Sequence, residues 1–144
     1  MPSLPFTGSI PDDLLYDPEY DMWVRLLPDG EALIGATAFG IHQAGEIIAF
    51  TSKPNGATVA RGRGMGTVEC RKTLLAVHAP ISFILRAGNE AAEERPKLVN
   101  SDPYGTGWMA RVQPTNWAQE REALVDAAVY RAQVQKIDPE ARFV

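Results

Sequence analysis

Lys72 is the residue whose type and surroundings best suit chemistry. It lies in the polar run Glu69-Cys70-Arg71-Lys72-Thr73, between the apolar runs Thr67-Val68 and Leu74-Leu75-Ala76-Val77. Two strand-like runs joined by a few polar residues predict a tight hairpin, with the lysine at its exposed tip. A lysine on a rigid tip, with an acidic residue three positions before it, is suited to carry a swinging cofactor arm. For an arbitrary hairpin the alternative is a solvated turn lysine, because turns are polar and exposed.

The other residues with reactive side chains are better explained by structure. Cys70 alternates with Glu69 and Arg71, so we expect it to share the inward face of its strand with Val68 and to be a buried small hydrophobe. Neither His42 nor His78 has a partner at metal-ligand spacing, and His78 is expected to be a surface or packing histidine. No nucleophile motif or paired carboxylates stand out. The sequence therefore does not indicate an enzyme, and no metal site is expected.

One glycine-rich segment, Arg61-Gly62-Arg63-Gly64-Met65-Gly66, superficially resembles a phosphate-binding loop. It precedes a predicted strand instead of following one and opening a helix, and it has no Gly-Lys-Ser/Thr. We interpret it as a tight connection between strands in which only glycine fits.

Length, composition and charge limit the class of protein. With 144 residues the chain is long enough for one domain, 1–144, and its 45% hydrophobic and 22% charged residues are ordinary for a globular protein. No apolar run approaches the ~20 residues that span a membrane. The net charge of −4 argues against a nucleic-acid partner. A single cysteine and an N-terminus without signal-peptide features make the cytoplasm the expected location.

The elements that must position Lys72 are mostly short strands. Residues 1–20 are expected to form an irregular lead-in. Asp21–Leu27 and Glu31–Ala36 predict a hairpin around Pro28-Asp29-Gly30. Further strand candidates are Glu46–Thr51, Ala57–Val59, Thr67–Cys70, Leu74–Val77, Ile81–Leu85 and Gly107–Val112.

Three helices are expected beside these strands. Thr37 is suited to cap a short helix through Gln43, which Gly45 would end, and Asn89–Arg95 favours another. Asn116 with Gln119 fits a capping box that would open a long C-terminal helix over 116–137. Many short strands with turns between them predict a small all-β sandwich or barrel with a terminal helix packed outside it. The absence of βαβ alternation argues against a Rossmann fold.

Four segments, in order, resemble the H protein of the glycine cleavage system, the lipoyl-carrying member of the biotinyl/lipoyl domain superfamily. They are Met22-Trp23-Val24 with Gly35-Ala36-Thr37; Ala44-Gly45-Glu46-Ile47-Ile48 with Pro54-Asn55-Gly56; Gly66–Thr73 with Ala79-Pro80-Ile81-Ser82; and Val99-Asn100-Ser101-Asp102-Pro103-Tyr104-Gly105-Thr106-Gly107-Trp108-Met109. The third lies where the family shows the pattern G-x-V-E-S-V-K-A, and the fourth is the most specific. The resemblance covers roughly residues 21–130.

The resemblance implies a mainly β fold, a barrel-sandwich hybrid with short peripheral helices and a C-terminal helix. It also implies that lipoate is the cofactor, amide-linked to Lys72. Glu69 lies where lipoate-attaching enzymes expect a carboxylate. The protein would then be a carrier, with the cofactor supplying the chemistry.

The departures from the family concern the groove that holds a charged aminomethyl-lipoyl arm. The family has His-Glu-Trp in the first strand and an aspartate four residues after the lipoyl lysine, whereas this chain has Asp21-Met22-Trp23 and Ala76. Asp21 is expected to substitute in part. Phe83 replaces a family glycine and is a further candidate for an apolar lining, which would suit a neutral or differently charged cargo.

Two carrier hypotheses follow, and the first is the main interpretation. The segment Ile10–Asp17 with Trp23-Val24-Arg25 resembles the lipoate-binding proteins of sulfur-oxidising bacteria, which implies a heterodisulfide-reductase-like partner complex and cargo exchange by thiol–disulfide chemistry. The alternative is an H protein that works with glycine decarboxylase, aminomethyltransferase and dihydrolipoyl dehydrogenase. An unmodified H-like scaffold is a third, less favoured hypothesis.

Overall fold

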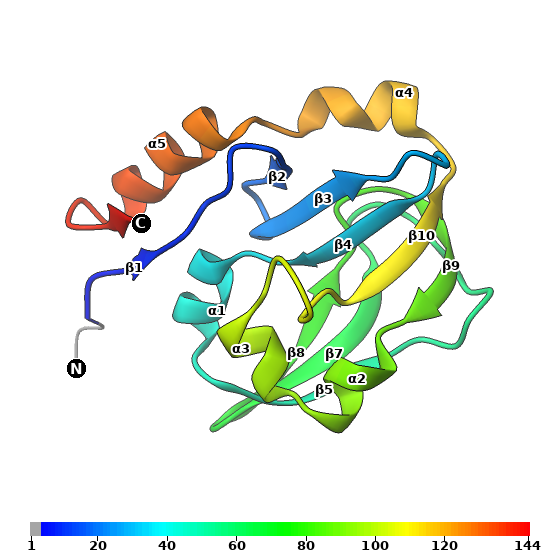
Figure 1. The fold of residues 1–144 in the computed structure, drawn as a ribbon, viewed down its shortest axis with the longest axis horizontal. Helices are drawn as coiled ribbons and strands as arrows, with labels where there is room; N and C mark the ends of the chain where they lie inside the picture. The colour runs from blue at the N-terminus through cyan, green and yellow to red at the C-terminus, as the bar shows by residue number, and fades with distance from the viewer. Residues whose placement is uncertain (1–3) are drawn as a thin grey trace.

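The computed structural model describes residues 4–144 and is built mainly from two antiparallel sheets. The larger sheet contains, in spatial order, β2 (Leu15–Asp17), β3 (Met22–Leu26), β4 (Ala32–Ala36), β10 (Ala110–Pro114), β9 (Phe83–Gly88) and β6 (Thr58–Val59). The smaller sheet contains β5 (Ile47–Ser52), β7 (Gly64–Cys70) and β8 (Thr73–His78). Figure 1 shows the two sheets packed face to face. The expected mainly β fold is confirmed as a sandwich-like pair of open sheets.

Short helices surround the sandwich (Figure 1). They are α1 (Ala38–Ala44), α2 (Glu90–Glu94), α3 (Lys97–Ser101), α4 (Trp117–Glu120), the 3₁₀ helix η1 (Arg121–Ala123) and α5 (Ala127–Ile137). As the sequence predicted, Thr37 caps α1 by accepting a hydrogen bond from the Gly40 N–H, and Gly45 ends the helix at φ 92°. The predicted β3–β4 hairpin is also confirmed, with Trp23 opposite Gly35.

Apolar side chains form two buried clusters. The larger fills the space between the sheets and includes Phe50, Val68 and Phe83. The smaller lies beneath α5, where the rings of Tyr16 and Tyr130 stack in parallel at 4.7 Å. Offset aromatic stacking of this kind adds about 0.5–1.5 kcal/mol to the stabilisation from burial. This second cluster fixes the C-terminal helix onto the start of the β-sandwich.

The lead-in predicted as irregular over 1–20 is partly regular, and its first three residues lie outside the described residues. β1 (Thr7–Gly8) pairs in parallel with β11 (Arg142–Phe143), and β2 pairs with β3. β1 depends on a partner at the other end of the chain, so local Pro, Gly and Asp content gave no sign of it, whereas β2 was missed although its partner is the next strand.

The prediction of one helix over 116–137 is wrong. The chain is extended at Leu124, and Val125 exchanges two backbone hydrogen bonds of 2.8 Å with Tyr16 on β2. A residue paired with a strand edge cannot also continue a helix. Asp126 then caps α5 through the Val129 N–H, whereas the expected cap residue Asn116 makes no side-chain capping bond.

Among the described residues, every helix is too short or too polar to span a membrane.

Candidate lipoyl-lysine site

Lys72 lies at the tip of the hairpin formed by β7 and β8. Cys70 pairs with Thr73, so only Arg71 and Lys72 remain as a two-residue loop. Both loop side chains are exposed. The structure therefore places the lysine where the sequence predicted, with its amine accessible to a modifying enzyme.

The flanks of the loop alternate as expected. Glu69 is exposed on the outer face of β7, three residues before Lys72, and it sits opposite Leu74 of β8. Cys70 and Val68 are buried on the inner face. Burial raises the pKa of the Cys70 thiol, which keeps it protonated and unreactive. The hairpin thus presents one carboxylate and one amine to solvent and directs its thiol into the core.

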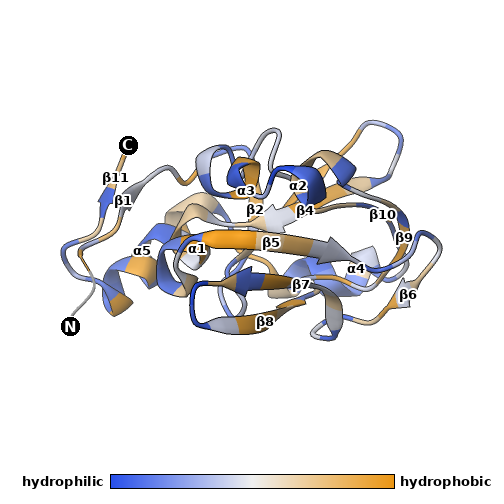
Figure 2. Ribbon diagram, turned by 90° about the horizontal axis from the view of Figure 1, so that it is seen from below, coloured by the Kyte–Doolittle hydropathy of each residue, from blue (hydrophilic) through white to orange (hydrophobic). Residues whose placement is uncertain are grey.

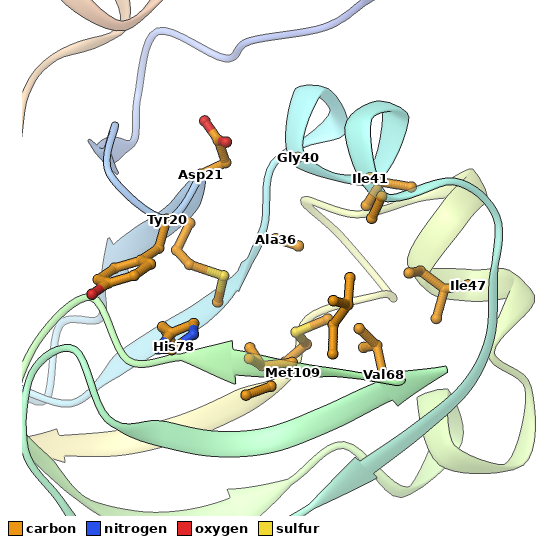
Figure 3. Close-up of a pocket in the computed structure, with 14 residues that line it drawn as sticks. Tyr20, Asp21, Ala36, Gly40, Ile41, Ile47, Val68, His78 and Met109 are labelled. Carbon is orange, nitrogen blue, oxygen red and sulfur yellow. The ribbon is translucent and has the colours of Figure 1, made fainter. Parts of the chain in front are cut away.

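A groove of about 160 Å³ opens beside this hairpin. Its walls come from the start of β3, from α1, from the start of β5 and from β8 (Figure 3). Most of the lining is apolar and includes Met22, Ile41, Ile47, Val68, Leu75 and Met109. Figure 2 shows that the start of β5, which lines the groove, is hydrophobic, whereas the end of β7, next to the hairpin tip, is hydrophilic.

The α1 wall of the groove is fixed by residues of the segment most specific to the resemblance. The Tyr104 hydroxyl accepts a hydrogen bond from the Ala38 N–H at the start of α1 and donates one to the Ser9 carbonyl. The Asn100 amide group bonds both backbone groups of Ile47 at the start of β5. These polar contacts hold two groove walls in position.

Asp21 lines the groove, but its carboxylate is engaged elsewhere. Its Oδ1 accepts a 2.7 Å hydrogen bond from the Tyr130 hydroxyl of α5, and Figure 3 shows the carboxylate pointing away from the other labelled side chains. Burial raises the pKa of Asp21, and the bond from Tyr130 opposes that rise. One carboxylate oxygen of Asp21 is therefore occupied by Tyr130, and its partial substitution for a missing groove carboxylate stays a prediction.

The direction of the hydrogen bonds behind Asp21 can be assigned. Tyr130 gives its one hydroxyl proton to Asp21, so the buried Thr37 hydroxyl must donate across the 2.7 Å contact to the Tyr130 oxygen. Thr37 in turn accepts from the Gly40 N–H. The chain of bonds joins α1, α5 and β3, and it holds Asp21 at a φ of 57°, a left-handed conformation that aspartate tolerates better than most residues.

Met22 and Ala76 both line the groove, as expected from the departures. Phe83 does not. It begins β9, is fully buried, and is opposite Val59 and Pro114. Its large ring belongs to the core between the sheets, so its inclusion among the candidate groove residues is wrong.

His78, expected as a surface or packing histidine, is half-buried and packs on Tyr20, and it also lines the groove, which the sequence did not predict. Its Nδ1 lies 2.8 Å from the Gly62 carbonyl oxygen, and its ring stacks on that of Tyr20 at 4.4 Å. It lines the groove in Figure 3. The available signal was its position on the same predicted hairpin as Lys72, six residues further along.

The observed geometry fits a lipoyl group. The groove begins at Leu75, three residues from Lys72, which is about 10 Å along a strand. An apolar channel of this size suits an acyl chain that ends in a small sulfur ring. In residues 4–144, by contrast, no cluster of metal-binding side chains is found, and Gly64–Gly66 belong to β7 and not to a phosphate loop.

Comparisons with known proteins agree with this arrangement. A family model described as "Glycine cleavage H-protein" matches residues 14–137. The glycine cleavage system H protein of Halorhodospira halophila is 36% identical over 124 residues, which cover 86% of this chain and 94% of that protein. The corresponding protein of Marinobacter nauticus is 39% identical over 127 residues, covering 88% and 96%. A crystal structure of a glycine cleavage system H protein from Mycobacterium marinum matches with a TM-score of 0.76 at 32% identity, covering 86% of this chain and 98% of that one.

Proposed function

Because the chain belongs to the glycine cleavage H-protein family, whose members carry lipoate covalently on a lysine and are not catalytic enzymes, we propose that Lys72 is the lipoylated residue. The observation that carries this proposal is the position of Lys72 on a two-residue hairpin tip beside an apolar groove. Lys53, Lys97 and Lys136 have no comparable surroundings. Glu69, exposed three residues earlier, is the carboxylate that we expect the lipoate-attaching enzyme to recognise.

For the cargo, we propose the aminomethyl group of glycine cleavage. The relatives described above support this proposal, because they are glycine cleavage system H proteins. The partners would then be glycine decarboxylase, aminomethyltransferase and dihydrolipoyl dehydrogenase, and we expect the cycle to operate in the cytoplasm. The protein positions the arm, and lipoate supplies the sulfur chemistry.

Reconstitution tests this proposal. Lipoylated protein is combined with the three partner enzymes, and glycine-dependent release of CO₂ is compared with that supported by an H protein from one of the relatives. Sustained turnover that is lost in Lys72→Arg is the expected result. Lipoylated protein that accepts nothing from the decarboxylase would refute the aminomethyl cargo.

A second candidate, a carrier of sulfur intermediates for a heterodisulfide-reductase-like complex, is favoured by one observation. Apolar Met22 and Ala76 line the groove, and Asp21 turns its carboxylate toward Tyr130. A cationic cargo would miss charge-assisted hydrogen bonds there, each worth about 1.5–3 kcal/mol when shielded from water. On this hypothesis Met22→Glu with Ala76→Asp increases turnover in the reconstituted assay. Full activity of the unchanged sequence, with no gain in the double variant, would exclude it.

A further inference from the structure

We propose that the His78 imidazole is the hydrogen-bond acceptor of the groove, and that its Nε2 binds a donor at the sulfur end of the lipoyl arm. The donor is a thiol S–H of the reduced arm or an ammonium N–H of an attached aminomethyl group. This inference rests on the proposed attachment at Lys72 and identifies the residue of the groove that would recognise the arm's polar end.

The tautomer of His78 follows from its backbone contact. The Gly62 carbonyl oxygen, 2.8 Å from Nδ1, can only accept a hydrogen bond, so Nδ1 carries the proton and donates it. In the neutral ring, Nε2 is then an acceptor with a free lone pair. Within residues 4–144, Nε2 has no hydrogen-bond partner, and it is not among the buried polar atoms that lack one. The acceptor is therefore accessible.

Two further contacts fix the ring's orientation. The Tyr20 ring stacks on it at 4.4 Å and an interplanar angle of 14°, and β8 anchors its backbone beside the groove. Figure 3 shows the imidazole at the groove beside Tyr20. A ring held by a stack on its face and a hydrogen bond at Nδ1 keeps Nε2 in one place, which is what a binding residue requires.

The rest of the lining leaves His78 as the acceptor that a donor would find. Among the described residues, Tyr20, Asp21 and His78 contribute polar side-chain groups to it. The Tyr20 hydroxyl lies beside Gly62, and the Asp21 carboxylate is bonded to Tyr130 and turned away (Figure 3). A donor that enters an apolar groove without a partner forfeits its hydrogen bonds to water. The imidazole nitrogen removes that cost by accepting a hydrogen bond from the donor. The oxidised dithiolane has no hydrogen-bond donor, so it gains nothing from this nitrogen.

The length of the arm decides how it must lie to reach this nitrogen. Six residues of strand separate Lys72 from His78, a span of about 20 Å. The lysine side chain and an extended lipoyl chain reach roughly 15 Å at the bond lengths of a saturated chain. An arm extended along β8, an imidazole ring that leans toward the tip of the hairpin, and the hydrogen bond of about 3 Å must together cover the remaining ~5 Å.

Nitrogen NMR tests the proposal without any substitution at His78. The chain has two histidines, and His42, whose Nε2 is 2.8 Å from the Leu4 carbonyl oxygen, is an internal control outside the groove. Histidine is ¹⁵N-labelled, lipoylation at Lys72 is verified by mass, and spectra are recorded at pH 8, where an ordinary imidazole is neutral. The oxidised and dithiol forms of the arm are compared, with Lys72→Arg under the same reductant as the matched control.

We expect the Nε2 resonance of His78 to shift upfield when the arm is reduced, with His42 unchanged and no shift in Lys72→Arg. Identical His78 resonances in the two forms of a fully lipoylated protein would overturn this inference while leaving the proposed attachment intact. Failure to attach lipoate at Lys72 would instead overturn the proposed function, and this inference with it.

Discussion

Replacing Tyr130 with phenylalanine should remove the hydroxyl that links α5 to the groove. It should lower the free energy of unfolding far more than removing an ordinary buried tyrosine hydroxyl does. The ring is fully buried, so phenylalanine fills the same space. Two hydrogen bonds of 2.7 Å are lost, one to the Asp21 carboxylate and one from the Thr37 hydroxyl. The charge-assisted bond and the unpaired buried Thr37 donor together give a loss of about 3–5 kcal/mol in the free energy of unfolding.

Tyr16→Phe is the matched control. Tyr16 is the equally buried partner of the same ring stack, but its hydroxyl makes only one neutral hydrogen bond, to the Pro11 carbonyl. We expect this control to cost about 1 kcal/mol. Urea unfolding of both variants and the wild type, followed by near- and far-UV circular dichroism, measures the difference.

The cost of Tyr130→Phe should also depend on pH. Burial raises the pKa of Asp21 above its ordinary 3.8, and Tyr130 lowers it by bonding the carboxylate. Removing the hydroxyl raises the folded-state pKa further, so the variant binds a proton more strongly when folded. Its deficit should therefore grow as pH rises through that raised pKa and level off above it. Equal costs for the two variants, or a Tyr130→Phe cost that does not change with pH, would refute the assigned network.

Two further predictions concern the neighbours of the site. Gly107→Ala should destabilise the protein by at least about 2 kcal/mol in the same unfolding assay, because its Cβ would lie 2.4 Å from the Leu98 carbonyl oxygen and 2.7 Å from that of Asp102. Gly64→Ala is the control, since its Cβ would lie in open space and should change stability by less than about 0.5 kcal/mol. Similar losses of stability in the two variants would contradict the packing around Gly107. Cys70 should react slowly with a disulfide reagent at pH 7.5 when folded and rapidly in urea, because it is buried and its thiol pKa is raised; rapid reaction of the folded protein would show that its side chain is exposed.

The parts of the fold that local sequence specifies were predicted well. The β3–β4 hairpin follows from two apolar runs around Pro28-Asp29-Gly30, and α1 follows from its Thr37 cap and terminal Gly45. The alternation that buries Cys70 and exposes Glu69 is equally local. Each of these features depends on residues that are close together in the sequence, within one helix, strand or hairpin.

The features that were missed depend on contacts between residues far apart in the chain. The break between α4 and α5 exists because Val125 pairs with Tyr16, and the turned carboxylate of Asp21 exists because Tyr130, 109 residues away, donates to it. The composition around Val125 remains that of a helix former. Similarly, nothing near His78 in sequence indicates that its ring would meet Tyr20. The groove is assembled from separate segments, so its lining could be inferred only in part.

The proposed function depends on attachment of the lipoyl arm to one lysine, Lys72. Intact-mass analysis after incubation with lipoate, ATP and a lipoate-attaching enzyme measures this directly, with Lys53→Arg as a control that keeps the hairpin lysine. We expect one lipoyl adduct on the wild type and on Lys53→Arg, and none on Lys72→Arg. An adduct of equal yield on Lys72→Arg would contradict it.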